Sequence, residues 1–144
     1  MTEEDKIKWL AGFIDGEGCI YIKELYRKDR KYSGSRLEVS IGNTALSILK
    51  DIQLDWGGNI ARKLVYGKNP KPCYEWRCSQ RKALALLQAI YPYLRIKNGQ
   101  AKVGIDFQEF IINRHICRRG LSEAEVVLRN AQRKHLQELK RVIA

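Results

Sequence analysis

Two acidic residues, Asp15 and Glu17, stand one residue apart at the end of an apolar stretch near the N-terminus. Gly16 lies between them and Gly18 follows, so the helix that carries them is expected to end abruptly at this point. Carboxylate oxygens with open coordination positions are the ligands that Mg²⁺ prefers. The pair therefore predicts a divalent-metal site, although Asp15 would equally serve as a residue that only terminates the helix.

The same apolar stretch carries Gly12 and Gly16, four residues apart. On a helix this spacing puts both glycines on one face, so that a second helix can approach closely. Small-residue packing is best known in membranes, but the charged flanks and short length here favour a tight interface between soluble helices. Two such helices side by side would bring two carboxylates together, which is costly unless cations neutralise them. The arrangement predicts a metal-dependent site for phosphodiester cleavage.

The stretch itself is predicted to be a helix over residues 3–14. Thr2 and Asp5 have the spacing of a capping box, with Asp in place of the usual Glu or Gln. The residues that recur at helical spacing on one apolar face are Ile7, Leu10, Ala11 and Ile14.

Beyond this helix, alternating strand patterns and helical patterns follow in turn. Strands are predicted over residues 19–28, 36–41, 59–66 and 73–79, and helices over residues 44–54, 81–90, 100–113 and 123–141, the last capped by Ser122. This order predicts a mixed α+β fold built from two hairpins. Residues 1–144 are expected to form a single domain, with a core over about 1–113 and a basic helical segment over about 114–144.

Each predicted hairpin has one apolar face, which we expect to pack on helices, and one polar face rich in basic residues. The polar face is expected to carry Tyr21, Lys23, Arg36, Glu38, Ser40, Glu75 and Arg77. A curved sheet with such a face suits the major groove of DNA. An ordinary solvated face is the alternative, because antiparallel sheets often expose one face to water.

Bulk composition points to the same class of partner. The net charge is +11, and the first 18 residues, which are net acidic, contribute none of this excess. Such a charge favours a polyanion, although a well-solvated basic protein remains an alternative. The four cysteines contain no C-x-x-C pair, so buried free thiols are expected rather than a zinc site. The acidic N-terminus lacks the features of a signal peptide, which predicts an intracellular protein, cytoplasmic or organellar.

The run Leu10-Ala-Gly-Phe-Ile-Asp-Gly-Glu-Gly18 closely resembles the signature of the LAGLIDADG homing endonucleases. The family's αββαββα core matches the predicted element order over about the first 113 residues. The segment from Tyr93 to Ala101 also resembles the family's stretch before its fifth helix. Glu17 replaces the final Asp of the nominal motif and still supplies carboxylate oxygens. The resemblance implies a curved antiparallel DNA-binding sheet and hydrolysis of DNA with Mg²⁺ or another divalent cation such as Mn²⁺.

The resemblance also implies roles for single residues in catalysis. Glu17 matches the metal-binding acid, and the backbone carbonyl of Gly16 would be a second ligand. Asn43 falls where the family often has an amide that orders active-site water, but it would also serve as a helix N-cap. Lys97 matches the basic residue that stabilises charge at the scissile phosphate.

Two further sets of residues are assigned to binding. The residues expected to contact DNA are Tyr21, Lys23, Arg27, Arg36, Glu38, Ser40, Arg62, Glu75 and Arg77. The residues expected at a dimer interface are Leu10, Gly12, Phe13 and Gly16. The dimer is expected because the chain holds only one copy of the motif and is too short for two. A homodimer implies a palindromic or pseudo-palindromic duplex site, with one half-site for each subunit.

Two other functions remain alternatives for a chain with this resemblance. An intron maturase would bind its own intron RNA on the same scaffold. A non-catalytic DNA-binding regulator would have lost the acid or gained another DNA-binding domain. The presence of Glu17 favours the endonuclease over both. The basic segment over about 114–144 is predicted either to support the core or to touch phosphates.

Overall fold

The structure, a computed structural model, describes residues 1–64, 66–113 and 123–143. The elements are α1 (Glu3–Glu17), β1 (Gly18–Tyr26), β2 (Tyr32–Asn43), α2 (Leu46–Trp56), β3 (Asn59–Lys63), β4 (Cys73–Ser79), α3 (Gln80–Ile90), the short 3₁₀ helix η1 (Tyr91–Tyr93), α4 (Asn98–Asn113) and α5 (Glu123–Ile143). The predicted α+β class and the αββαββα order are confirmed. The predicted cap at Ser122 lies outside the described residues.

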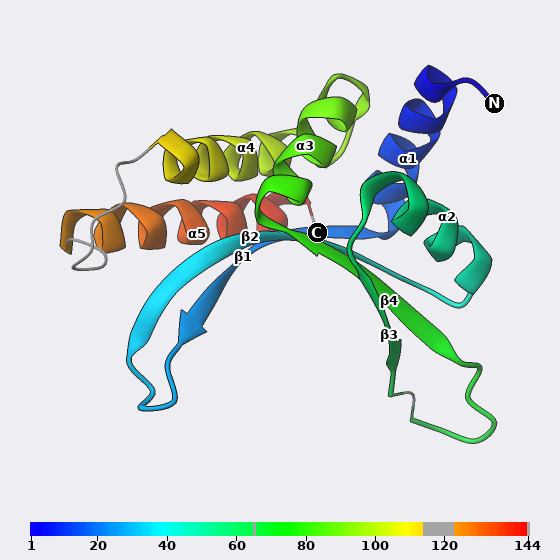
Figure 1. The fold of residues 1–144 in the computed structure, drawn as a ribbon, viewed down its shortest axis with the longest axis horizontal. Helices are drawn as coiled ribbons and strands as arrows, with labels where there is room; N and C mark the ends of the chain where they lie inside the picture. Colours follow the sequence, from blue (N-terminus) through cyan, green and yellow to red (C-terminus); the bar gives the residue numbers. More distant parts are fainter. Residues whose placement is uncertain (65, 114–122, 144) are drawn as a thin grey trace.

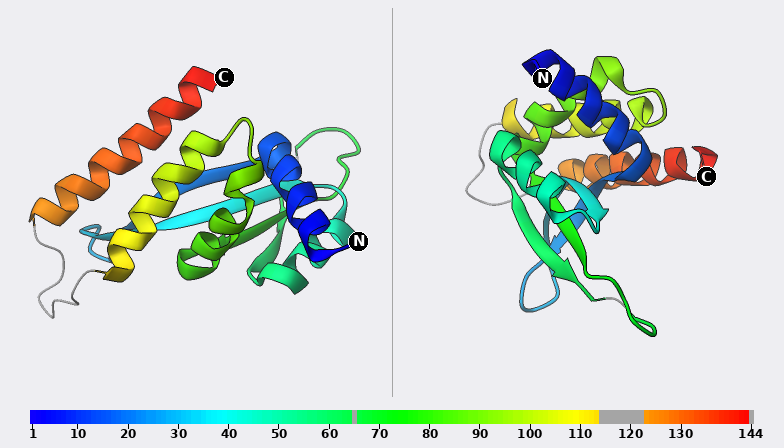
Figure 2. Two further views of the ribbon diagram at one scale, coloured as in Figure 1. Left: turned by 90° about the horizontal axis from the view of Figure 1, so that it is seen from above. Right: turned by 90° about the vertical axis from the view of Figure 1, so that its right-hand side faces the viewer.

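The four strands form one antiparallel sheet in the order β1-β2-β4-β3. The sheet is strongly curved, and the helices lie on its convex side while the two hairpins reach down on either side of an open concave surface (Figure 1). Seen from above, α3, α4 and α5 cover one part of the sheet, and α1 and α2 cover the other (Figure 2).

The core lies between the sheet and the helices. Alternation along the strands buries Ile20, Val39 and Trp76 completely, and the helices contribute Leu87 and Phe107 from above. Each of these side chains leaves water on folding, which supplies most of the driving force for the fold. The apolar sheet face predicted from the alternation is confirmed.

The end of α1 differs from the prediction. The helix begins as expected, because Thr2 Oγ1 accepts a hydrogen bond from the Asp5 N–H at 3.1 Å. It continues past Ile14 to Glu17, and Gly18 then closes it by donating its N–H to the Ile14 carbonyl. Both acids of the motif therefore lie in the last helical turn rather than after it.

Several other boundaries were also predicted wrongly, including the start of β2 at Tyr32 rather than residue 36 and the end of β1 at Tyr26 rather than residue 28. Strand β2 runs through Asn43, so α2 starts at Leu46 and not at Thr44. Strand β3 ends at Lys63, three residues before the predicted end at Tyr66. Element ends are set by pairing partners and caps, which local periodicity does not reveal.

Helix α5 packs against α4 and along β1. Leu136 is buried in the common core, and Arg133 Nε lies 2.7 Å from Glu24 Oε1 of β1. Further along the helix, Lys140 Nζ donates to Cys19 Sγ at 3.4 Å. Of the two roles predicted for the C-terminal segment, α5 shows the first, because it supports the core and covers the edge strand. Within the described residues no helix, α5 included, is long and apolar enough to cross a membrane.

Candidate active site and DNA-binding surface

The carboxylate of Asp15 is fully engaged within its own chain. Oδ2 accepts the N–H of Arg95 at 2.8 Å, and Oδ1 accepts the N–H groups of Ile96 and Lys97 at 3.2 and 2.9 Å. These three donors belong to the loop between η1 and α4, so Asp15 fixes that loop to the end of α1. Neither predicted role, helix terminator or metal ligand, describes this residue.

The side chain of Glu17, unlike that of Asp15, makes no hydrogen bond to the described chain. Its side chain is exposed, and it has no hydrogen-bond or ion-pair partner among the residues that the structure describes. The carbonyl of Gly16 lies in the last helical turn, where backbone oxygens lack intrahelical partners. Both groups are hard oxygen donors and fit a divalent cation.

One chain offers only part of a coordination shell at this point. In the described ranges no three side chains of His, Cys, Asp or Glu come together as a metal-binding group. Since a divalent cation such as Mg²⁺ takes about six ligands, other ligands have to come from outside the chain.

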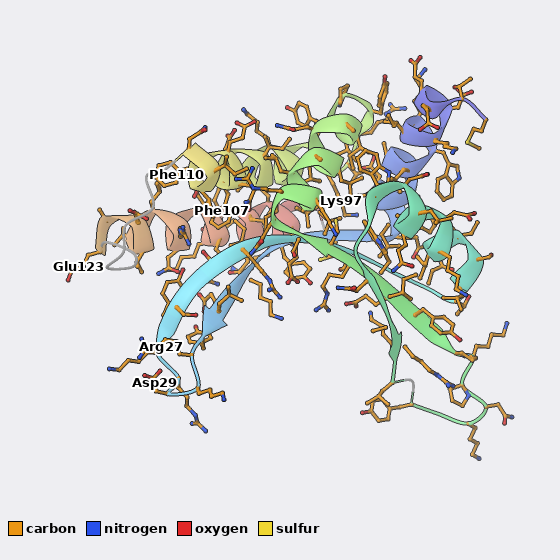
Figure 3. All side chains as sticks on the ribbon, viewed as in Figure 1. Arg27, Asp29, Lys97, Phe107, Phe110 and Glu123 are labelled. Carbon is orange, nitrogen blue, oxygen red and sulfur yellow. The ribbon has the colours of Figure 1, made fainter. Side chains whose placement is uncertain are left out.

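Lys97 lies at the same end of α1. Figure 3 labels Lys97. Its ammonium group donates to the backbone carbonyl of Asp15, with Nζ 2.6 Å from that oxygen. An ammonium has three donors, so two are left for another acceptor. The structure thus brings Lys97 to the helix end that carries Gly16 and Glu17, which lie far from it in the sequence.

Asn43 closes β2 close to the end of α1, since Gly18 pairs with Ile41 across the β1–β2 ladder. Its Oδ1 accepts the N–H of Ala45 at 2.8 Å. This bond closes a turn ahead of α2, whose N-cap is Ala45 without any side-chain capping bond, so the predicted N-cap role of Asn43 is wrong. The Asn43 amide nitrogen is the group left for other partners.

The outer face of α1 has no covering in the described structure. A Cβ added at Gly12 or Gly16 would meet no described atom within 4 Å. Phe13 is half-buried, and Trp9, 43% exposed, stacks on it with ring centroids 5.0 Å apart. Leu10, in contrast, is 3% exposed and lies in the core of its own chain.

The prediction of Leu10 as an interface residue is therefore wrong, because its side chain packs inward. Trp9, which the sequence analysis missed, is instead the residue exposed on the uncovered face of α1. Its position three residues before Gly12 and seven before Gly16 was the available signal, because these spacings fall on one helical face. We refer to Trp9, Gly12, Phe13 and Gly16 as the α1 stripe.

The strand register confirms the predicted polar face on the concave side of the sheet (Figure 1). Arg62 does not belong to it, because it pairs with Tyr74 on the opposite face. Lys63 pairs with Cys73 and takes the corresponding place on the polar face.

Arg27 lies beyond the end of β1, and it belongs to the tip of the β1–β2 hairpin rather than to a strand. There its Nη2 lies 2.6 Å from Asp29 Oδ2 (Figure 3). Both side chains are exposed, so this ion pair adds little to stability.

Charged side chains on the polar face are joined in a network. Glu38 is completely buried and accepts hydrogen bonds from Tyr21 Oη and, at 2.7 Å, from Arg36 Nε. Arg77 Nε lies 3.7 Å from the same carboxylate. Burial and the bond to Glu38 raise the pKa of Tyr21 well above its ordinary value, so this hydroxyl remains a donor.

The network continues to the next strand. Glu75 accepts from Arg77 Nη2 and lies 3.0 Å from Lys63 Nζ. Burial alone would raise the pKa of Glu75, but the hydrogen bonds from Lys63 and Arg77 outweigh it and hold that pKa below its ordinary value. The two carboxylates, Glu38 and Glu75, thus order three cationic side chains, Arg36, Arg77 and Lys63, and leave one positive charge unbalanced.

Comparisons with known proteins agree on one family. Residues 10–114 match the family model described as LAGLIDADG endonuclease. Over 101 residues the chain is 36% identical to the DNA endonuclease I-CvuI of Chlorella vulgaris, covering 68% of this chain and 60% of the length of that relative.

Solved structures of homing endonucleases share the fold. The structure of I-CvuI in complex with its target in the presence of Ca has a TM-score of 0.74 at 24% identity, covering 94% of this chain and 82% of that one. The archaeal intron-encoded I-Vdi141I complexed with DNA has a TM-score of 0.74 at 19% identity, covering 96% and 86%.

Proposed function

Because this chain belongs to the LAGLIDADG endonuclease family, we propose that it is a site-specific DNA endonuclease that works as a homodimer with a divalent cation. The observation that carries the proposal is the exposed carboxylate of Glu17, which has no partner in the part of the chain that the structure describes. It lies at the end of α1, beside Lys97 and at the start of the strand that leads onto the polar sheet face.

Double-stranded DNA is the substrate that fits the concave face. The face is curved, polar and basic, and antiparallel strands of this kind lie in the major groove in other DNA-binding proteins (Figure 1). I-CvuI and I-Vdi141I share the fold and were solved with DNA. Residues 1–144 act as one endonuclease domain in this proposal, with α5 as its C-terminal support.

A second identical chain completes the site. The α1 stripe exposes two glycines and a stacked pair of aromatic rings, and such a surface packs closely against a copy of itself. A twofold axis along this stripe brings the two Glu17 side chains together. It also supplies the ligands that one chain lacks, and it presents two sheet faces to two DNA half-sites.

The roles of the residues follow from their places. Glu17 and the carbonyl of Gly16 would hold Mg²⁺ or another divalent cation, which activates water and neutralises charge on the phosphate. Lys97 is placed by its bond to Asp15 and directs its remaining donors towards a scissile phosphate. Asp15 keeps Lys97 in position, because its Oδ1 accepts the N–H of Lys97.

The test is cleavage of a supercoiled plasmid library with genomic or random inserts in the presence of magnesium. Wild type is expected to make discrete double-strand cuts, and Glu17→Gln is expected to bind the same sites without cutting. Glu3→Gln, which removes an exposed carboxylate from the first turn of the same helix, is the matched control and should cut normally. If wild type binds one DNA or RNA tightly but never cuts, the endonuclease proposal fails in favour of a regulator or a maturase.

A further inference from the structure

Glu38 is an unusual member of the polar sheet face, because its side chain has no exposed surface. Every other charged residue of that face retains some exposure. Its two oxygens are already used, one by Arg36 and the other by Tyr21 with Arg77 close by. To contact a DNA base directly, Glu38 would have to break these interactions and leave Arg36 unpaired, while Arg77 would keep only its hydrogen bond to Glu75.

The position of Glu38 in the sheet explains how it gathers these partners. It lies in β2, between β1 and β4, with Tyr21 directly opposite on β1 and Ser79 opposite on β4. Arg36 precedes it by two residues in the same strand, and Arg77 lies diagonally across on β4. One carboxylate therefore holds donors from three strands.

Both arginines turn the same atom towards Glu38. Arg36 Nε donates to Oε1 at 2.7 Å, while Arg77 Nε is 3.7 Å from Oε2 and has no hydrogen-bond partner among the described residues. Arg77 in addition donates from Nη2 to Glu75, and the two arginine side chains are 33% and 42% exposed. Two adjacent N–H donors of an arginine match the O6 and N7 acceptors of guanine in the major groove.

We propose that Glu38 is a specificity-determining positioning residue, which orients Arg36 and, more weakly, Arg77 to read guanines and itself contacts no base. The inference rests on the proposed DNA-binding function. An arginine held by its Nε has already lost much of its rotational freedom, so less order has to be imposed when it meets a base. Glu38 thereby sets sequence preference at two base pairs rather than at one.

The experiment is selection of half-sites from a randomised duplex library by binding, without any requirement for cleavage. Arg36→Ala and Arg77→Ala, compared with wild type, identify the base pair that each arginine reads. Glu38→Gln is then expected to lower guanine preference at both positions, by about tenfold or more at the Arg36 position and by less at the Arg77 position. In a Glu38→Gln/Arg36→Ala double variant, preference at the Arg36 position should be no lower than in Arg36→Ala alone.

Glu24→Gln is the matched control. It removes a carboxylate that also pairs with an arginine at 2.7 Å, but Glu24 alternates with Tyr21 and Lys23 along β1 and so lies outside the polar set. Its half-site profile should match wild type. Should Glu38→Gln fail to fold, Glu38→Asp keeps the buried charge and withdraws it from Arg36, and it should lower preference at the Arg36 position.

Two results would overturn the inference. Loss of preference at one new position, with the two arginine positions unchanged, would make Glu38 a direct base reader. Weaker binding at all positions alike would make it a purely structural residue. Magnesium-dependent cleavage by wild type is measured separately on the selected DNA, so a wild type that binds but never cuts refutes the proposed function and leaves the inference standing. A wild type without sequence preference refutes the inference itself.

Discussion

Two hydrogen bonds join Asp15 and Lys97, and each links a backbone group of one residue to the side chain of the other. The backbone N–H of Lys97 donates to Asp15 Oδ1 at 2.9 Å, and the ammonium group of Lys97 donates to the backbone carbonyl of Asp15 at 2.6 Å. The pair joins the last turn of α1 to the start of α4. As a consequence, the residue proposed to bind the metal and the lysine proposed to face the phosphate cannot move independently.

Asp15→Asn tests the hydrogen bond that the Asp15 carboxylate accepts from the Lys97 N–H. The amide would place one N–H₂ group against backbone donors, so at least one charge-assisted hydrogen bond is lost from a buried site. We expect the free energy of unfolding to fall by about 2–3 kcal/mol, measured by urea denaturation. Glu17→Gln, two residues further on, should leave it unchanged or higher, because the Glu17 carboxylate has no partner in the described chain. Equal losses in both variants would contradict the assigned roles.

Lys97→Met tests the ammonium group of Lys97, which donates to the Asp15 carbonyl. Without the ammonium group, developing charge on the phosphate loses a donor, and the single-turnover cleavage rate should fall by about 10²- to 10³-fold. DNA affinity should change far less, because one contact among many is lost. Lys102→Met, one turn further along α4 and paired with Asp106, is the control and should cut at the wild-type rate. A loss of affinity that accounts for the whole effect would assign Lys97 to binding alone.

Gly12→Leu tests the dimer. A Cβ at this position would meet no described atom within 4 Å, so the far-ultraviolet circular dichroism should remain that of a folded chain. It would separate two α1 helices, and the dimer dissociation constant should rise by at least about tenfold. Sedimentation equilibrium measures this, with Ala131→Leu on an exposed part of α5 as control. An unchanged dimer would place the interface elsewhere on the molecule.

Gly18→Ala and Gly16→Ala should differ although both change a glycine of the motif. A Cβ at Gly18 would lie 2.8 Å from the Ile14 carbonyl oxygen and 2.9 Å from Ile14 Cα, both backbone atoms. Relieving this contact is expected to cost about 1–3 kcal/mol of stability. Gly16→Ala meets no described atom and gains helix propensity, so the isolated subunit should not be destabilised. Urea unfolding at low protein concentration distinguishes the two.

Cys78 gives a prediction for alkaline pH. Burial raises the pKa of its thiol from 9.0 to about 12. The unfolded chain therefore loses this proton near pH 9 while the folded chain keeps it, so the contribution to stability is present below pH 9 and is lost as pH rises towards 12. Between pH 8 and about 10.5, wild type should lose more stability than Cys78→Ala, measured by thermal unfolding. If the stability of both proteins fell equally with rising pH, the Cys78 thiol would not be shielded from water in the folded protein.

Much of the fold follows from short-range patterns. Strand alternation and the Thr2 cap predicted the hairpins, the two sheet faces and the start of α1, because each depends on neighbours a few residues away. Ends of elements were less predictable. The helix α1 outlasts Gly16 because Gly18 is the residue that closes it, and a glycine in sequence does not show whether it ends a helix or only exposes its face.

The roles of the acidic residues were likewise predictable only in part. The sequence by itself determined that Asp15 and Glu17 lie at a glycine-rich helix end and that basic and aromatic residues share one sheet face, since helical and strand periods are properties of the chain. Only the tertiary structure decided that Asp15 binds backbone groups 80 to 82 residues away and that Glu17 has no partner among the described residues. It also decided that Leu10 packs inward and that Glu38 is enclosed by partners from three strands. Burial and hydrogen bonding depend on which distant segments meet, and that is fixed when the sheet and helices pack.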